Sequence, residues 1–140
     1  MSDEVTEQDE ETYWFNYSST LRIFGHIHDH DEITRILGLA PTYTHRRGDR
    51  RSPRSQPFEH DMWSYVSPVP EDRPLDVHIQ TLWAQLKPHR DYLMTLKERL
   101  TVDVFCGYRS NCGTAGIEVS HRSLEMFTQL EIPFGLSVIV

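Results

Sequence analysis

Apolar residues recur every three or four positions between residues 75 and 100, and no other feature of the sequence constrains the fold as strongly. This spacing is that of an amphipathic helix whose apolar face packs on a second layer. Pro88 lies inside the pattern. Because proline lacks an N–H and clashes with the preceding turn, we expect a kink or a break near Lys87. The series comprises Leu75, Ile79, Leu82, Leu86, His89, Leu93, Leu96 and Leu100.

Segments with a two-residue period supply the second layer. From residue 13 to residue 23, large or apolar side chains alternate with polar ones, which indicates a strand with one buried face. Two shorter helices are expected, one capped by Asp29 and ended by Gly38, the other capped by Ser120. Further strands are expected over residues 42–45, 58–67, 102–106, 117–119 and 134–140, with a hairpin over residues 107–116. The order β-α-β-β-α-β-β-α-β predicts an α+β domain with its helices on one face of a mainly antiparallel sheet.

Negative charge is concentrated at the start of the chain. The 140 residues include 21 acidic and 14 basic side chains, a net charge of −7, and six of the acids lie in residues 1–11. Residues 12–140 therefore carry 15 acids and 14 bases and are close to neutral. A segment with few apolar residues and one sign of charge cannot bury enough surface to offset its ordering entropy, so we expect residues 1–11 to be a disordered acidic tail. Residues 12–140 are expected to form a single domain.

The sequence has the character of a cytoplasmic protein. No stretch approaches the roughly 18 consecutive apolar residues of a membrane span, and the first residues have neither the basic start nor the apolar block of a signal peptide. Two cysteines are too few for a disulfide scaffold. Cys106 shares a face with Val102 and Val104, which favours a buried thiol, although a disulfide to Cys112 across the expected hairpin is sterically allowed.

Positive charge gathers in one segment that has the composition of a loop. Glycine and proline residues interrupt residues 46–57, which favours an exposed connection. Guanidinium groups bind carboxylates and phosphates, and aromatic residues of the neighbouring strands, including Tyr43, offer stacking surface. The predicted binding residues are Arg46, Arg47, Arg50, Arg51, Arg54, Trp63 and Tyr65.

The overall charge distribution favours a protein as the partner of these arginines. Because the body of the chain is near neutral and the tail is acidic, the long-range attraction on which nucleic-acid binders depend is missing. We therefore expect a protein with an acidic surface, and no nucleic acid or membrane. A second interpretation stays open, in which the acidic tail pairs with the arginines of the same molecule or of another copy.

Three histidines form the strongest candidate for chemistry. His26, His28 and His30 alternate with Asp29 and Asp31, and imidazole and carboxylate groups are ligands of zinc, nickel and copper. The spacing departs by one residue from the metallohydrolase pattern His-x-His-x-Asp-His, and Asp29 already has a sufficient role as a helix cap. We therefore expect a solvated turn, with no catalytic residue, metal or cofactor. The alternative is a metal-dependent or small-ligand enzyme centred on the three histidines.

Several motifs after the acidic tail together indicate a family. They are LRI (21–23), DEITRILGLAPT (31–42), RGD (47–49), WSY (63–65), LKPH (86–89), VDVFCG (102–107) and LEIP (130–133). This set resembles the uncharacterised bacterial family called domain of unknown function 4279. It departs from the family at His30 and His121, where the resemblance implies proline at the start of a helix. The resemblance implies a small α+β domain and no agreed activity.

The leading hypothesis is a non-enzymatic interaction or ligand-binding domain, with an immunity-like or accessory role suggested by analogy with other small standalone domains. Its arginine-rich loop would contact an acidic partner. A homodimer through a strand edge is a further expectation, because the segment of residues 13–24 is long and aromatic.

Overall fold

The computed structural model describes residues 12–113 and 116–140, so the expectation of a disordered tail over residues 1–11 falls outside the described residues. One five-stranded sheet has the order β2-β3-β1-β4-β5. Pairing is antiparallel except between β4 and β5, which are parallel. The strands are β1 (Phe15–Gly25), β2 (Tyr43–His45), β3 (Asp61–Val66), β4 (Thr101–Ser110) and β5 (Leu136–Ile139). The predicted α+β class with a mainly antiparallel sheet is confirmed.

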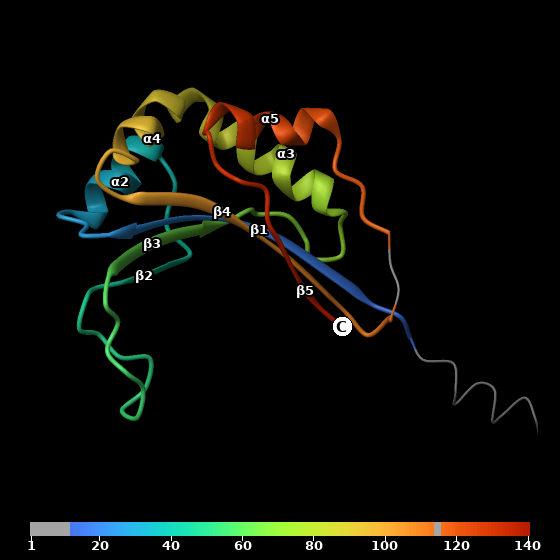
Figure 1. Ribbon diagram of the computed structural model, residues 1–140, viewed down its shortest axis with the longest axis horizontal. Helices are drawn as coiled ribbons and strands as arrows, with labels where there is room; N and C mark the ends of the chain where they lie inside the picture. The colour runs from blue at the N-terminus through green and yellow to red at the C-terminus, as the bar shows by residue number, and fades with distance from the viewer. Residues whose placement is uncertain (1–11, 114–115) are drawn as a thin grey trace, which may run out of the picture.

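All the helices cover the same face of this sheet and leave the other face open (Figure 1). They are α2 (His30–Leu37), α3 (Leu75–Leu86), the 3₁₀ turn η1 (Lys87–His89), α4 (Arg90–Leu96) and α5 (His121–Gln129). The predicted caps are present: Asp29 Oδ1 accepts the N–H of Asp31 at 3.0 Å, and Ser120 Oγ accepts that of Ser123. None of the helices within the described ranges is both long and apolar enough to span a bilayer.

The long apolar pattern breaks where proline predicts a break. α3 ends at Leu86, and the η1 turn contains Pro88. The buried residues of α4 then continue the apolar face of α3. Leu82, Leu86 and Leu93 are fully buried, so one apolar face continues across the break and packs on the sheet. The missing N–H of proline therefore changes the helix type without removing the second layer.

Alternation along β1 separates the two faces of the sheet. Ser19, Leu21 and Ile23 have no exposed surface and face the helices. The residues between them, such as Arg22 and Phe24, face the opposite side, because successive strand residues point to opposite faces. The open face therefore belongs to the even-numbered residues of β1 and to their partners on neighbouring strands.

The predicted hairpin after Cys106 is wrong. β4 continues as one strand to Ser110, because β1 is long enough to pair with it from Phe24 opposite Thr101 to Phe15 opposite Ser110. Residues 116–120 form no strand, so the strand expected over residues 117–119 is absent and the order of elements has one strand fewer than predicted. Both cysteines are free thiols: Cys106 is buried within β4 and Cys112 lies beyond its end.

The strand edges also differ from the expectation. β1 is the central strand: β4 pairs with it from Phe15 to Phe24, and β3 covers its other side from Thr20 to Gly25. The two edges of the sheet are β2 and β5. The paired backbone groups of Thr20–Phe24 leave no free edge for a second copy at that half of β1.

Candidate functional site

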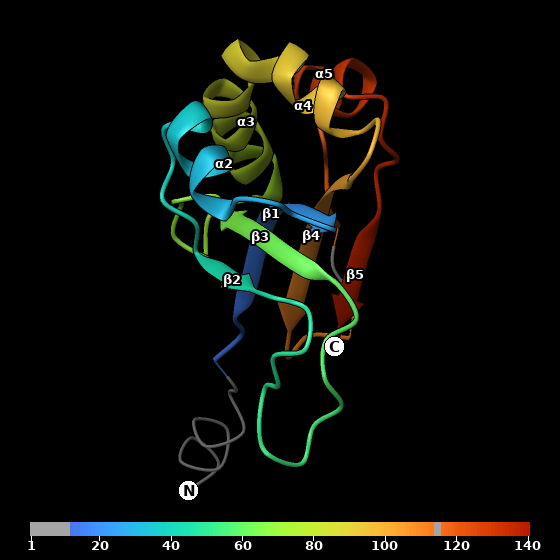
Figure 2. The ribbon, with the colours of Figure 1, turned by 90° about the vertical axis from the view of Figure 1, so that its left-hand side faces the viewer.

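The arginine loop, defined as residues 46–57, connects β2 to β3 and extends from the sheet on the side away from the helices (Figures 1 and 2). No strand or helix forms within it, as its glycine and prolines predict. The side chains of Arg46, Arg47, Arg50, Arg51 and Arg54 are all exposed. The structure thus presents all five predicted arginines on one projecting segment, next to the open face of the sheet.

Backbone hydrogen bonds close the base of the arginine loop. The N–H of Gly48 donates to the carbonyl of Phe58 at 2.9 Å, and the N–H of Phe58 donates to the carbonyl of Asp49 at 2.8 Å. Gly48 has φ 91°, a left-handed conformation that glycine adopts without steric cost. The Asp49 side chain accepts the N–H of Arg46 at 2.9 Å. The loop therefore leaves the sheet through a fixed neck and is positioned before any partner binds.

A buried carboxylate fixes this neck to the rest of the domain. Asp61, at the start of β3, is 7% exposed and accepts the N–H of Arg47 at 2.7 Å and the N–H of Ile27 at 2.9 Å. The hydrogen bond from Arg47 is the largest cause that lowers the pKa of Asp61, since it favours the charged form. One side chain thus joins the arginine loop to the turn between β1 and α2.

An aromatic hollow lies beside the arginine loop on the open face. His45 stacks on Phe58 with ring centroids 3.7 Å apart and 6° between the planes, and its Nδ1 is 3.0 Å from the hydroxyl of Tyr43. Burial lowers the pKa of His45, which favours the neutral ring. The hollow has a volume of about 260 Å³ and is lined by Phe24, Tyr43, His45, Arg51, Phe58, Glu59, His60, Asp61 and Met62.

An ion pair lies at the centre of the open face. Arg22 donates two hydrogen bonds to the carboxylate of Asp103, at 2.8 and 2.7 Å, across the β1–β4 pairing. The guanidinium carbon lies 5.1 Å from the ring centroid of Phe105 and 5.8 Å from that of Phe24. This hydrogen bonding raises the pKa of Arg22. The charge of Arg22 is balanced by this partner, whereas Arg109 of β4 is exposed on the same face and the arginine loop adds five exposed guanidinium groups beside it.

Two predicted binding residues do not belong to this surface. Trp63 is completely buried beneath α2, where its Nε1 donates to Thr34 Oγ1 at 3.0 Å. Tyr65 lies on the same side of β3, packs against the core and accepts a hydrogen bond from Gln85 at 3.1 Å. Trp63 and Tyr65 were expected beside the arginines, but odd-numbered residues of β3 face the helices, so the two side chains lie on the other side of the sheet from the open face. Tyr43 is 45% exposed and does border the arginine loop.

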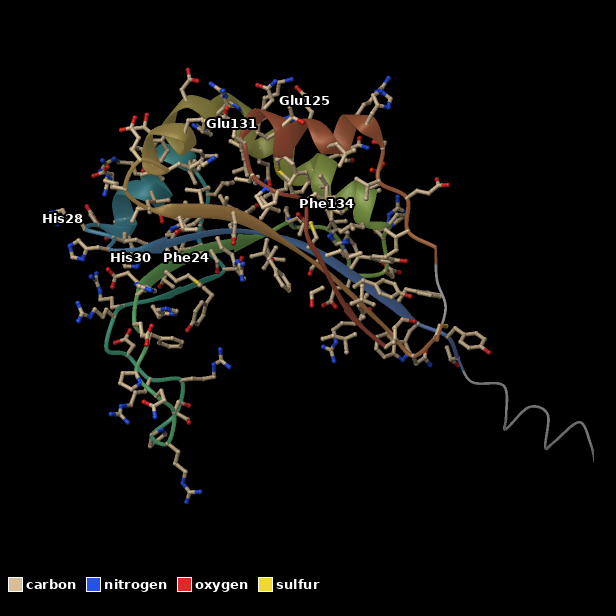
Figure 3. All side chains as sticks on the ribbon, viewed as in Figure 1. Phe24, His28, His30, Glu125, Glu131 and Phe134 are labelled. Carbon is tan, nitrogen blue, oxygen red and sulfur yellow. The ribbon has the colours of Figure 1, made fainter. Side chains whose placement is uncertain are left out.

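The three candidate metal ligands do not converge. The side chain of His26 is 91% exposed, and His28 is exposed at the turn between β1 and α2 (Figure 3). His30 is 8% exposed, and its Nε2 lies 3.2 Å from the carbonyl of His45. Within residues 12–113 and 116–140, no group of three histidine, cysteine or acidic residues is arranged to hold a metal ion. The described residues therefore form no metal site centred on these histidines.

The family model for a domain of unknown function (DUF4279) matches residues 15–140. The chain belongs to this family. The match confirms the resemblance that the motifs of the sequence indicate. No match was found among the curated proteins or among the solved structures.

The arginine loop and the hollow of this DUF4279 domain present groups suited to recognising an anion and an apolar side chain. Exposed guanidinium groups form paired hydrogen bonds with carboxylates, and the adjoining hollow offers apolar contact area. Sequence analysis found the arginines and missed the aromatic hollow, whose residues come from β1, β2, β3, the arginine loop and residues 58–60. No local pattern could have indicated it, because the hollow exists only once the strands have paired in this register.

Proposed function

We propose that this DUF4279 domain is a non-enzymatic interaction module whose arginine loop binds an acidic surface of another protein. The single observation that carries the proposal is the geometry of the loop: five exposed arginines project from a neck that hydrogen bonds already hold in place. A prearranged loop loses little conformational entropy on binding, so more of the interaction energy remains available for the partner.

The distribution of the other charges supports an acidic partner. Arg22 is paired with Asp103, and the acids on the helical side, such as Glu125 and Glu131, lie far from the arginine loop in the view of Figure 3. Residues 46–57 contain five arginines and only one acid, Asp49. This separation of charge favours one orientation of an approaching acidic surface.

A protein partner fits the charges better than nucleic acid. The positive charge is confined to one loop of a body that carries 15 acids and 14 bases, whereas nucleic-acid binding draws on a wider basic surface. We place this interaction in the cytoplasm, with an immunity-like or accessory role as the working hypothesis. A homodimer through a strand edge could use β2, β5 or the half of β1 that β3 leaves uncovered, and sedimentation velocity would detect it.

The proposal is tested by comparing two variants with the same change of charge. In the first, Arg46, Arg50, Arg51 and Arg54 are replaced by glutamine; in the second, the exposed residues Arg35, Arg73, Arg99 and Arg122 are replaced by glutamine. Each tagged protein is cross-linked in cells, and the cross-linked sites are mapped by mass spectrometry. Arg47 is kept in both variants so that the neck of the loop, where its N–H contacts Asp61, retains its native residue.

We expect cross-links between the loop and acidic segments of a partner in the wild-type protein and in the second variant, and their loss in the first. Equal cross-linking by the two variants would show that the arginine loop is not the binding surface. Cross-links that map to the helical layer in all three proteins would contradict the proposal as well.

A further inference from the structure

We propose that the aromatic hollow is an anchor pocket for one large apolar side chain of an acidic partner segment, while the carboxylates that flank this side chain bind Arg51 and the other loop arginines. This inference rests on the proposed function and adds the chemistry of the partner. It is carried by the position of the hollow, by its size and by the charges at its rim.

The walls of the hollow come from separate parts of the chain and are held by contacts of their own. Phe24 and Met62 are directly opposite each other on β1 and β3. His45 stands between Tyr43, with ring centroids 5.4 Å apart, and the stacked ring of Phe58. Phe58 is in turn fixed by its two backbone hydrogen bonds to the neck of the arginine loop. The hollow is therefore formed in the free protein, which is typical of an anchor site.

The hollow has room for one large side chain, and its volume lies just below the range typical of cofactor and drug-sized ligand sites. Sites for such molecules typically enclose about 300–1,000 Å³, and this hollow measures about 260 Å³. Its surface is mostly made of aromatic rings and the Met62 side chain. An aromatic or long aliphatic side chain matches both the size and the chemistry, and such residues dominate the anchors of protein interfaces.

The charged residues around the hollow determine where the acids of the partner can lie. Glu59 and Asp61 also line it, and a carboxylate placed inside would be repelled by both. Arg51 lines the same hollow and belongs to the arginine loop, which carries the positive charge of this region. The matching segment is therefore uncharged at its centre and acidic on its flanks.

Synthetic peptides test this inference with the full chain. The probe is a fluorescein-labelled heptapeptide with one phenylalanine between three acidic residues on each side, and the control peptide has glycine in place of the phenylalanine. Dissociation constants are measured by fluorescence anisotropy. From the apolar area that a phenylalanine ring can bury, we expect the phenylalanine peptide to bind at least about tenfold more tightly than the glycine peptide.

Two variants of the wall and one matched control locate this preference. Phe58→Ala and Met62→Ala each remove part of the hollow, and Met62→Ala leaves the neck of the loop untouched. Both are expected to reduce the preference for phenylalanine to less than about threefold. Leu124→Ala removes a side chain that is 39% exposed on α5, and it should leave the preference unchanged.

The outcomes separate the two proposals. If the two peptides bind equally tightly and both need the loop arginines, the arginine loop stands as the binding surface and the anchor pocket is wrong. If neither Arg51→Gln nor the four-arginine loop variant weakens either peptide relative to Arg122→Gln, the proposed function fails as well. A preference for phenylalanine that survives Met62→Ala in a folded protein, as judged by circular dichroism, would also overturn the anchor pocket.

Discussion

The carboxylate of Asp61 accepts the backbone N–H of Arg47 at 2.7 Å, and this contact joins the arginine loop to the core of the domain. The other oxygen of the same carboxylate accepts the N–H of Ile27, so one buried side chain satisfies two segments that are 20 residues apart in the sequence. Without this carboxylate, the loop would still have its backbone pairing at Gly48 and Phe58, but it would lose its direct contact with the turn that follows β1.

Replacing Asp61 by asparagine tests this role. Asparagine offers only one acceptor oxygen and places a buried amide nitrogen next to an N–H donor, so we expect the free energy of unfolding to fall by about 1–3 kcal/mol. Urea denaturation measures this change, and hydrogen exchange should show a loss of protection at the amides of Arg47 and Ile27. Asp72→Asn, at an exposed position, is the control. Unchanged protection in Asp61→Asn would contradict the role given to the carboxylate.

Acidification should destabilise the domain through two histidines, the buried His78 and the half-buried His45. His78 is 1% exposed and forms a hydrogen bond of 2.9 Å with Ser67 Oγ. Burial lowers the pKa of His78, and also that of His45, below the ordinary value of 6.5. The unfolded chain therefore binds more protons than the folded one in this range, so the stabilising contribution is present above pH 6.5 and is lost as the pH falls through the lowered pKa values.

Urea denaturation between about pH 7.5 and about pH 5 measures this dependence. We expect the free energy of unfolding to decrease toward the acidic end, and to decrease less steeply in His78→Gln than in the wild-type protein. His121→Gln, at an exposed position, should retain the wild-type slope. Stability that rises on acidification would contradict the assignment of neutral, buried histidines.

The two cysteines should differ strongly in reactivity. Burial raises the pKa of the Cys106 thiol to about 11, and its side chain has no exposed surface, so the reactive thiolate is both rare and inaccessible. Cys112 is half-buried beyond the end of β4. We expect one thiol of the folded protein to react rapidly with a disulfide reagent under reducing-agent-free conditions, and Cys112→Ser to abolish this fast phase. A fast phase that persists in Cys112→Ser, or no reactive thiol in the wild-type protein, would refute this prediction.

Sequence periodicity predicted those helices and strands whose type is determined by the residues of the segment itself. The apolar series and Pro88 predicted α3, η1 and α4, and the alternation of polar and apolar residues predicted β1. The hairpin at residues 107–116 was predicted wrongly because the end of β4 is decided by its partner: β1 continues to Phe15 and keeps β4 paired up to Ser110. The length of a strand is a property of the pair, which local composition does not contain.

The candidate site likewise has one part that a single segment determines and another that depends on how the strands pair. Composition was enough to locate the arginine loop, because glycine and proline indicate a loop and the arginines themselves indicate its positive charge. The face on which Trp63 lies could not be read in the same way, because a strand shifted by one residue would turn every side chain to the other face. The face of Trp63 is determined by its contact with α2, which buries it. Pairing of β3 with β1 and β2 then brings Met62 beside Phe24 and His45.

The most direct test of the account is an NMR titration of the labelled full chain with the acidic phenylalanine peptide. Binding through the arginine loop predicts chemical-shift changes concentrated at residues 46–58 and at the neighbouring residues of β2 and β3, and their disappearance when Arg46, Arg50, Arg51 and Arg54 are replaced by glutamine. Shift changes that map instead to α3 and α5, or that persist unchanged in the four-arginine variant, would contradict the central claim that this loop is the binding surface.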